Sequence, residues 1–355
     1  MRISDCGLEG MLEFLISHPN CRITIRNPKS TIRNHFMPPT PFTKLINPRF
    51  PANAIGIESS SASVVLLERR RPSGFALRRA ATITLPASLV QPSFDERNIT
   101  DTREMADTLA ELVTSAGLAR QRKWSAALPE AAARTVIITL ESAPTSRAEM
   151  EEILRWKIER GFGAPLEELR VARQRLNSDS QGHPRYLATA THESVLAEYE
   201  AVFAALGWRT GLVLPRHVGE VRWLERSNRP GDALLLSSHL EGFTAMLIRG
   251  TQPVIVRSVM CEPEDRDDEL FRLLLFYRDR LAPVDDNASP PHGLERLLVV
   301  GDGFSKEHVS EIINETLGVN LPALGPEEVG LNLPSSELSF DLIAAPAGLA
   351  TLAWG

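Results

Sequence analysis

The chain has 355 residues, of which 43% are apolar and 24% are charged, and its formal net charge is −6. This composition is typical of a soluble globular protein that is long enough for two lobes and a substantial core. The acidic balance argues against non-specific nucleic-acid binding, which needs a basic face, so we expect no nucleic-acid partner.

The cysteines and the apolar runs indicate a cytoplasmic protein. Cys6, Cys21 and Cys261 lie far apart and form no Cys/His cluster, so neither a disulfide scaffold nor a zinc site is expected. No uninterrupted apolar run reaches the roughly 18 residues of a transmembrane helix. The apolar stretch near the N-terminus is broken by glutamates, which is unlike a secretion signal. We expect the protein to reach the inner membrane only indirectly, through a partner.

The first residues differ in character from the rest of the chain. Residues 1–36 precede Met37-Pro38-Pro39, which reads like a natural protein start. They are either an upstream extension from a misassigned start codon or a poorly packed N-terminal arm. Together with a short linker they form an expected N-terminal region over residues 1–50.

The first predicted sheet opens with a strand, a turn of small residues and a second strand within Ala54–Leu67. A third strand is expected over Phe75–Leu85. Apolar residues then recur at helical spacing over Thr102–Ala116, which predicts a helix. Short strands are expected at Trp124–Leu128 and Arg134–Leu140.

A second group of elements comes next. Ser146, with Glu149 three residues later, forms a capping box that predicts a helix start. The apolar face of this helix consists of Met150, Ile153, Leu154 and Ile158. A strand over Tyr186–Thr191 and a helix over Ser194–Leu206 complete the first half of the chain.

The opening pattern repeats in the second half. Strands are expected at Ala233–Leu236, Phe243–Arg249 and Val254–Val259, with a turn over Ser237–Gly242. The remaining predicted elements are a helix over Asp267–Leu281, a polar loop over Ala282–Gly293, a buried strand over Leu297–Val300, a helix ending at Leu317 and a closing helix from Asp341. This duplication predicts two related α/β lobes that face a cleft, over residues 51–230 and 231–355.

Several segments, taken in this order, resemble the actin-like ATPase superfamily. Within it they resemble the PilM-type proteins of type IV pilus assembly, which are related to the cell-division protein FtsA. The segments are Phe42–Pro48, Ile55–Glu58 with the turn after it, Glu151–Glu159, Leu247–Gly250, Val300–Ser305 and Leu317–Leu321. The resemblance implies a two-lobed, ribonuclease H-like duplicated fold with an α+β subdomain inserted in the first lobe, at about residues 123–185.

The resemblance also implies a scaffold function at an envelope machine. Proteins of this type bind the cytoplasmic tail of a PilN-like single-span membrane protein in a groove between the inserted subdomain and the first lobe. Cytoplasmic motor or ring proteins are further candidate partners. Trp156 is the candidate groove residue, since aromatic anchors dominate such interfaces, and packing within the subdomain is its alternative role.

A site for ATP and Mg²⁺ is implied as well. Small residues let backbone N–H groups approach phosphate, and carboxylates organise Mg²⁺. The candidate residues are Glu58, Ser60, Ser61 and Ser63 in the first hairpin, Glu241 in the second, and Gly301 and Gly303 on the adenosine side. However, Ser237-Ser238-His239 lacks the acid and the glycine that the family pattern places there. We therefore predict a degenerate site with weakened or lost nucleotide binding, no catalytic residue and no protein metal site.

Other functions stay open at this point. They are an active actin-like ATPase that cycles with ATP, a small-molecule kinase of the same superfamily, and the cytoplasmic module of a type II secretion platform. The kinase function lacks support because the acid that the family pattern places in the hairpin of the second lobe is missing and no catalytic aspartate is evident. Modules of type II secretion normally continue into a transmembrane helix, which is not expected here.

Overall fold

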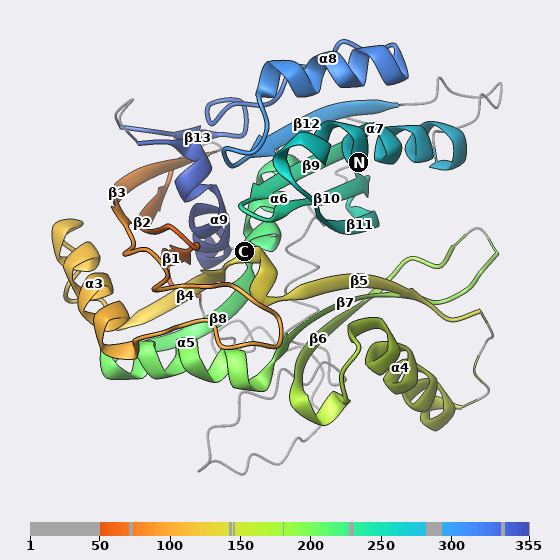
Figure 1. Cartoon of the computed structure of the whole chain (residues 1–355). Helices are drawn as coiled ribbons and strands as arrows, with labels where there is room; N and C mark the ends of the chain where they lie inside the picture. The colour runs from red at the N-terminus through yellow and green to blue at the C-terminus, as the bar shows by residue number, and fades with distance from the viewer. Residues whose placement is uncertain are drawn as a thin grey trace, which may run out of the picture.

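The computed structural model describes residues 50–70, 74–141, 144, 146–179, 181–226, 231–281, 293–334 and 338–354. These residues form two α/β lobes and a smaller third unit (Figure 1). The expected N-terminal extension and most of the polar loop before Gly293 lie outside the described residues. None of the described helices combines the length and the hydropathy that crossing a bilayer would need.

The first lobe is built on a six-stranded sheet with the order β13-β3-β2-β1-β4-β8. Its strands are β1 (Asn53–Ile57), β2 (Ser61–Arg69), β3 (Phe75–Thr84), β4 (Lys123–Leu128), β8 (Arg209–Pro215) and β13 (Leu331–Asn332). Strands β1 to β3 form an antiparallel meander, and β4 and β8 continue the sheet in parallel beyond β1. The helices α3 (Thr102–Ser115) and α5 (Glu193–Ala205) share an apolar core with this sheet.

The second lobe repeats this plan in a four-stranded sheet with the order β11-β10-β9-β12. Its strands are β9 (Asp232–His239), β10 (Gly242–Arg249), β11 (Gln252–Met260) and β12 (Leu294–Val300). The helices α7 (Arg266–Phe276), which continues into the π-helical turn η4 (Tyr277–Leu281), and α8 (Lys306–Leu317) share its core. The meander followed by a parallel strand occurs in both lobes, which confirms the predicted two-lobed fold.

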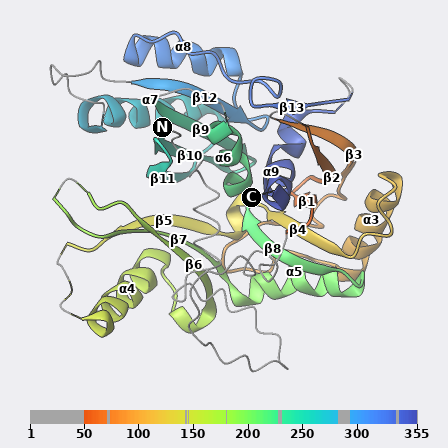
Figure 2. The ribbon, with the colours of Figure 1, turned by 180° about the vertical axis from the view of Figure 1, so that it is seen from behind.

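The inserted subdomain is an antiparallel sheet, β5-β7-β6, backed by one helix (Figure 2). Its elements are β5 (Arg134–Thr139), α4 (Arg147–Phe162), β6 (Leu169–Leu176) and β7 (Arg185–His192). Ser146 caps α4 as predicted, because its side chain accepts a hydrogen bond from the Glu149 N–H. The expected bounds of about 123–185 need correction: β4 pairs with β1 and β8, so the subdomain runs from Arg134 to His192.

Two helices connect the two lobes. Each helix belongs to one half of the sequence and packs against strands of the other half. Helix α6 (Arg216–Arg226) lies within the expected first lobe, where it contacts β4 and β8, and it also packs on β9 and β12 of the second lobe. Helix α9 (Phe340–Ala350) closes the chain and packs on β1, β2 and β4, while β13 pairs with β3. Short 3-10 turns complete the fold at η1 (Glu130–Ala132), η2 (Leu166–Glu168), η3 (Pro263–Asp265) and η5 (Thr351–Trp354).

The crossing of α6 and α9 is unusually close and depends on two glycines. A Cβ added to Gly219 would lie 2.2 Å from the carbonyl oxygen of Ala345, and one added to Gly348 would lie 1.9 Å from the carbonyl oxygen of Gly219. Beside this contact, the Trp223 indole N–H donates to the Ala344 carbonyl at 2.8 Å. Only glycine allows two helix backbones to approach so closely, so this crossing fixes how the lobes meet.

Candidate functional site

The cleft between the lobes lies where the β1–β2 turn faces the β9–β10 turn. The cavity there measures about 10 Å³ and is lined by Glu58, Ser59, Pro92, Pro129, Glu130, Ala131, His239, Leu240 and Glu241. Such a volume is about what one water molecule needs. This cavity by itself is therefore smaller than a triphosphate group.

Glu58, the predicted Mg²⁺-organising acid, already has a cation from the protein beside it. Its Oε1 lies 3.0 Å from Nη1 of Arg216, and Nε of Arg216 donates to Oε1 of Glu220 at 2.8 Å. The side chains of Arg216 and Glu220 are buried. Burial raises the pKa of Glu58 to about 7, although Arg216 acts in the opposite direction.

A second acid in the cleft, Glu130, was not predicted from the sequence. Nδ1 of His217 lies 2.6 Å from its Oε1, and the Thr244 hydroxyl donates to the same oxygen at 2.8 Å. Thr244 also shares a hydrogen bond with the Ser258 hydroxyl at 2.8 Å. Burial raises the pKa of Glu130, but the neighbouring His217 ring and the hydrogen bond from Thr244 outweigh it and lower the pKa to about 2. Because Thr244 belongs to β10, this contact links the two lobes.

The predicted phosphate-binding serines occupy three different environments. Ser60 is exposed in the β1–β2 turn, and Ser61 is half-buried at the start of β2. Ser63 is buried, and its hydroxyl donates to the Leu342 carbonyl in α9 at 2.7 Å. The assignment of Ser63 to phosphate therefore needs correction, because its hydroxyl is used in the packing of α9.

The two glycines of the predicted adenosine side have partners inside the protein. The Gly301 N–H donates to the Asp341 carboxylate at 3.2 Å, and the Gly303 N–H donates to the Ser238 hydroxyl at 2.9 Å. A Cβ on Gly301 would lie 2.5 Å from the Ser238 carbonyl oxygen, so the glycine serves a close backbone approach. The N–H groups expected to approach a nucleotide are thus engaged in contacts between protein segments.

The hairpin of the second lobe differs from the expected turn. Strand β9 runs to His239, so Ser237 and Ser238 are strand residues, and the turn begins only at Leu240. The Arg266 side chain donates to the carbonyls of His239 and Leu240, at 2.9 and 3.0 Å, which fixes this turn. Burial raises the pKa of the predicted ligand Glu241. Burial lowers the pKa of His239 to about 4, which keeps that ring neutral near pH 7.

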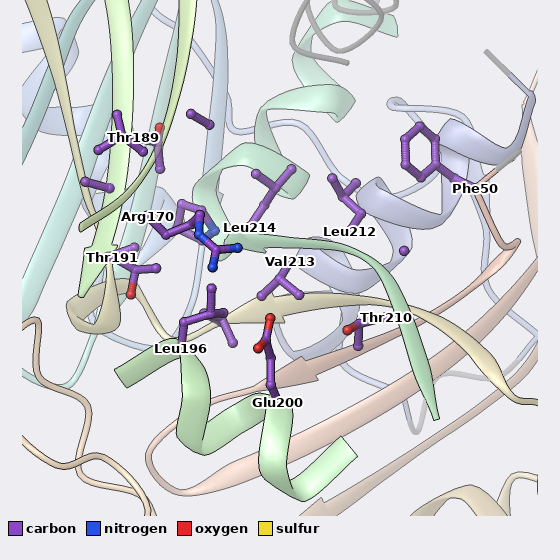
Figure 3. A pocket seen from close by; sticks show the side chains of 17 residues that line it. Phe50, Arg170, Thr189, Thr191, Leu196, Glu200, Thr210, Leu212, Val213 and Leu214 are labelled. Atoms are coloured by element: carbon purple, nitrogen blue, oxygen red, sulfur yellow. The ribbon is translucent and has the colours of Figure 1, made fainter. Parts of the chain in front are cut away.

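A much larger opening, hereafter the groove, lies between the inserted subdomain and the first lobe (Figure 3). Its volume is about 420 Å³. The lining residues come from the linker (Phe50), β4 and the turn after it (Leu128, Ala133), β6 (Arg170, Val171, Ala172), β7 (Thr189, Ala190, Thr191), α5 (Leu196, Glu200) and β8 (Thr210, Gly211, Leu212, Val213, Leu214, Pro215). Most of these side chains are apolar, so the groove suits an apolar segment.

The strands that line the groove include two sheet edges. In the described residues, β8 ends the six-stranded sheet and β6 ends the three-stranded sheet. Arg170 on β6 pairs with Glu193 at 3.2 Å, whereas Glu200 on α5 is exposed and makes no ion pair with any described residue. Figure 3 shows Glu200 directed toward the groove. The groove therefore combines apolar walls, two strands that no described strand pairs on their outer side, and one carboxylate at its rim.

Trp156, the predicted groove residue, lies elsewhere. It is on α4 with 55% of its surface exposed, and the Arg160 guanidinium lies 5.2 Å from the ring centre. Helix α4 packs on the subdomain sheet through Leu154 and Ile158, and Trp156 is off that buried stripe. Trp156 therefore does not line the groove, and its role in partner binding stays a prediction.

Comparisons with known proteins bear on the fold. No family model and no curated protein matches the sequence. Among solved structures, the PilM–PilN type IV pilus biogenesis complex is similar, with a TM-score of 0.69 at 22% identity over 87% of this chain and 100% of the other. This similarity and the repeated strand order confirm the two-lobed actin-like fold with an inserted subdomain.

Two further structures are similar at lower scores. A Bacteroides thetaiotaomicron protein with an actin-like ATPase fold and unknown function has a TM-score of 0.42 at 11% identity, over 88% of this chain and 99% of the other. The cytoplasmic domain of EpsL, an inner-membrane component of the Vibrio cholerae type II secretion system, has a TM-score of 0.39 at 12% identity, over 76% and 96%. Scores this low support no conclusion about this chain.

Proposed function

We propose that this chain is a PilM-type actin-like platform protein on the cytoplasmic side of the inner membrane. In this proposal, the groove binds the cytoplasmic tail of a PilN-like, single-span membrane protein. The observation that carries the proposal is the open, mostly apolar groove of about 420 Å³ between the inserted subdomain and the first lobe. A solved structure with a similar fold is a complex of PilM with PilN.

The chemistry of the groove favours an extended tail with a basic residue. An added strand can hydrogen-bond to an open sheet edge while alternate side chains enter apolar pockets, and β6 and β8 offer such edges. Cytoplasmic segments next to a transmembrane helix are rich in Lys and Arg. The carboxylate of Glu200, which has no ion pair among the described residues, would receive such a side chain.

Blocking the groove should abolish tail binding. Gly211 lies exposed in β8, and the nearest atom to an added Cβ is a Pro51 carbon at 3.9 Å, so a Cβ can be added here without a backbone clash. We expect Gly211→Trp to raise the Kd for the tail at least about 100-fold, which corresponds to about 2.7 kcal/mol. The probe is a synthetic peptide of the N-terminal cytoplasmic residues of the single-span protein encoded in the neighbouring reading frame, and calorimetry measures its affinity.

The matched control is Gly211→Ala, which adds only a methyl group at the same position. Its Kd should stay within about threefold of wild type. Such a change in binding free energy is well below the roughly 1.4 kcal/mol that a tenfold change in Kd represents. The thermal midpoints of both variants should match wild type. Equal affinity of Gly211→Trp and wild type would exclude the groove as the binding site.

We further propose that the protein works without an ATP cycle. Three features of the cleft support this: Arg216 provides the cation beside Glu58, Arg266 fixes the β9–β10 turn, and the glycine N–H groups have internal partners. Millimolar Mg-ATP should therefore leave the thermal midpoint unchanged. A ligand at about 100 times its Kd adds about 2.7 kcal/mol, which would shift the midpoint of a chain this size by several degrees.

A titration with magnesium chloride alone is the control for this experiment. An ATP-specific shift of several degrees, or turnover of ATP by the purified chain, would favour the alternative of a cycling actin-like ATPase.

A further inference from the structure

The part of the chain that the structure describes begins at the groove. Phe50, its first residue, is half-buried and lines the groove, and a carbon of Pro51 lies 3.9 Å from where a Cβ on Gly211 would be. The Asn53 side chain then donates to the Lys123 carbonyl at 2.7 Å, which fixes the entry to β1. The residue before Phe50 is therefore attached directly at the groove wall that β8 forms.

The groove leads away from Phe50 along β8. Figure 3 shows it extending from Phe50 past Leu212 and Leu214 toward Thr189. Among the described residues, no strand pairs with the outer side of β8. Strand β8 has seven residues, which span about 23 Å. Eight extended residues reach about 26 Å, so the eight residues before Phe50 are long enough to follow this edge.

Residues 42–49 have the composition that the groove favours. Their sequence has three large apolar side chains, two basic ones and no acidic one, and it reads Phe42-Thr43-Lys44-Leu45-Ile46-Asn47-Pro48-Arg49. A proline also disfavours a helical conformation of the residue before it, which suits an extended segment. The groove walls are mostly apolar, and the Glu200 carboxylate makes no ion pair with any described residue. Length, polarity and charge thus fit an occupant that the chain itself supplies.

Covalent attachment favours this occupant over a separate peptide. A short tether gives an effective concentration on the order of 1 mM. A contact with an intrinsic Kd of about 0.1 mM would then be made in about nine-tenths of the molecules. Only the remaining tenth would be free to bind a tail, so the measured Kd of the tail would be about tenfold higher.

We propose that residues 42–49 occupy the groove in the free protein and that a tail has to displace them. In this proposal, the segment follows the outer edge of β8, places its apolar side chains against the groove walls and brings a basic side chain to Glu200. The contact keeps an apolar surface covered until the partner binds. Displacement by a tail rests on the proposed function, whereas occupancy of the groove by residues 42–49 is a property of the free chain.

Photo-crosslinking of the free, full-length chain tests the occupancy. A photoreactive amino acid is placed at Val213, which lines the groove, or at Trp156 on α4. Trypsin cleaves after Lys44 and Arg49, so mass spectrometry separates attachment to residues 45–49 from attachment at Phe50 and beyond. We expect attachment within one molecule to residues 42–49 from position 213 and none from position 156. Attachment only between two molecules, or none to residues 42–49, would overturn the proposal.

The affinity for the tail peptide tests the displacement. The double variant Leu45→Ser, Ile46→Ser removes two apolar side chains of the segment. We expect it to lower the Kd of the neighbouring-frame tail peptide about tenfold, because the competing contact is lost. The matched control is Ile23→Ser, Ile25→Ser, which removes two apolar side chains outside residues 42–49. The control should stay within about twofold of wild type.

The two measurements separate this inference from the proposed function. If neither wild type nor the Leu45→Ser, Ile46→Ser variant binds the peptide, the proposed function fails, but attachment from position 213 to residues 42–49 still supports the occupancy. If that attachment is absent and both proteins bind the peptide equally, the occupancy is overturned and the proposed function stands. Equal Kd values despite the attachment would overturn the displacement.

Discussion

Gly219→Ala should lower the free energy of unfolding by more than about 3 kcal/mol. Overpacking typically costs about 1–3 kcal/mol, and here the added Cβ would meet backbone, at 2.2 Å from the Ala345 carbonyl oxygen. Neither helix can move away, because α6 and α9 both contribute to the apolar cluster that joins the lobes. This loss is a large fraction of the roughly 5–15 kcal/mol that stabilises a typical domain. Urea unfolding followed by circular dichroism measures it.

Gly161→Ala is the matched control, because Gly161 is also a helical glycine. Its added Cβ would meet nothing closer than a Val136 methyl carbon at 3.8 Å. Alanine is favoured over glycine in helices by about 0.5–1 kcal/mol, so this variant should be neutral or slightly stabilised. Equal urea midpoints for the two variants would contradict the close crossing of α6 and α9.

Glu130→Gln should lower the stability at pH 7 by about 3 kcal/mol. The pKa of Glu130 is lowered from 4.5 to about 2 in the folded chain, and each unit of difference corresponds to about 1.4 kcal/mol. Because the folded pKa is the lower one, this contribution is fully present above about pH 4.5. It is lost as the pH falls toward 2. Glutamine keeps the shape of the side chain but removes the charge that faces His217.

The measurement is urea unfolding of wild type and Glu130→Gln at several pH values between about 3 and 7. The variant should show a smaller loss of stability below pH 4.5 than wild type does. Glu200→Gln is the control, because Glu200 is an exposed carboxylate without an ion pair among the described residues, and such substitutions usually change stability by less than about 0.5 kcal/mol. Parallel pH profiles for all three proteins would contradict the role of Glu130.

The sequence predicted those elements whose apolar pattern follows their own geometry. The two opening hairpins, α3 and α8 were correctly placed because their buried residues recur at strand or helix spacing. Strand β8 was missed because Gly211 and Pro215 make its sequence resemble a loop. Helix α6 was missed because Arg216, His217 and Glu220 are buried, which interrupts an apolar stripe.

The candidate site was harder to predict because side-chain partners come from distant parts of the chain. The sequence contains no sign that the Ser63 hydroxyl binds the Leu342 carbonyl, 279 residues later. Glu130 stands alone in an alanine-rich turn after a proline, and only its position at the end of a buried strand could have singled it out. The general position of the groove followed from the resemblance, but its lining residues required the structure.

Site-specific photo-crosslinking tests the groove as the tail-binding site most directly. A photoreactive amino acid is placed either at Thr210, which lines the groove, or at Trp156, which lies on α4 away from it. The peptide from the neighbouring reading frame is then added and irradiated. We predict a covalent product from position 210 and none from position 156. A product from position 156 alone, or from neither position while the peptide is bound, would contradict the proposed function.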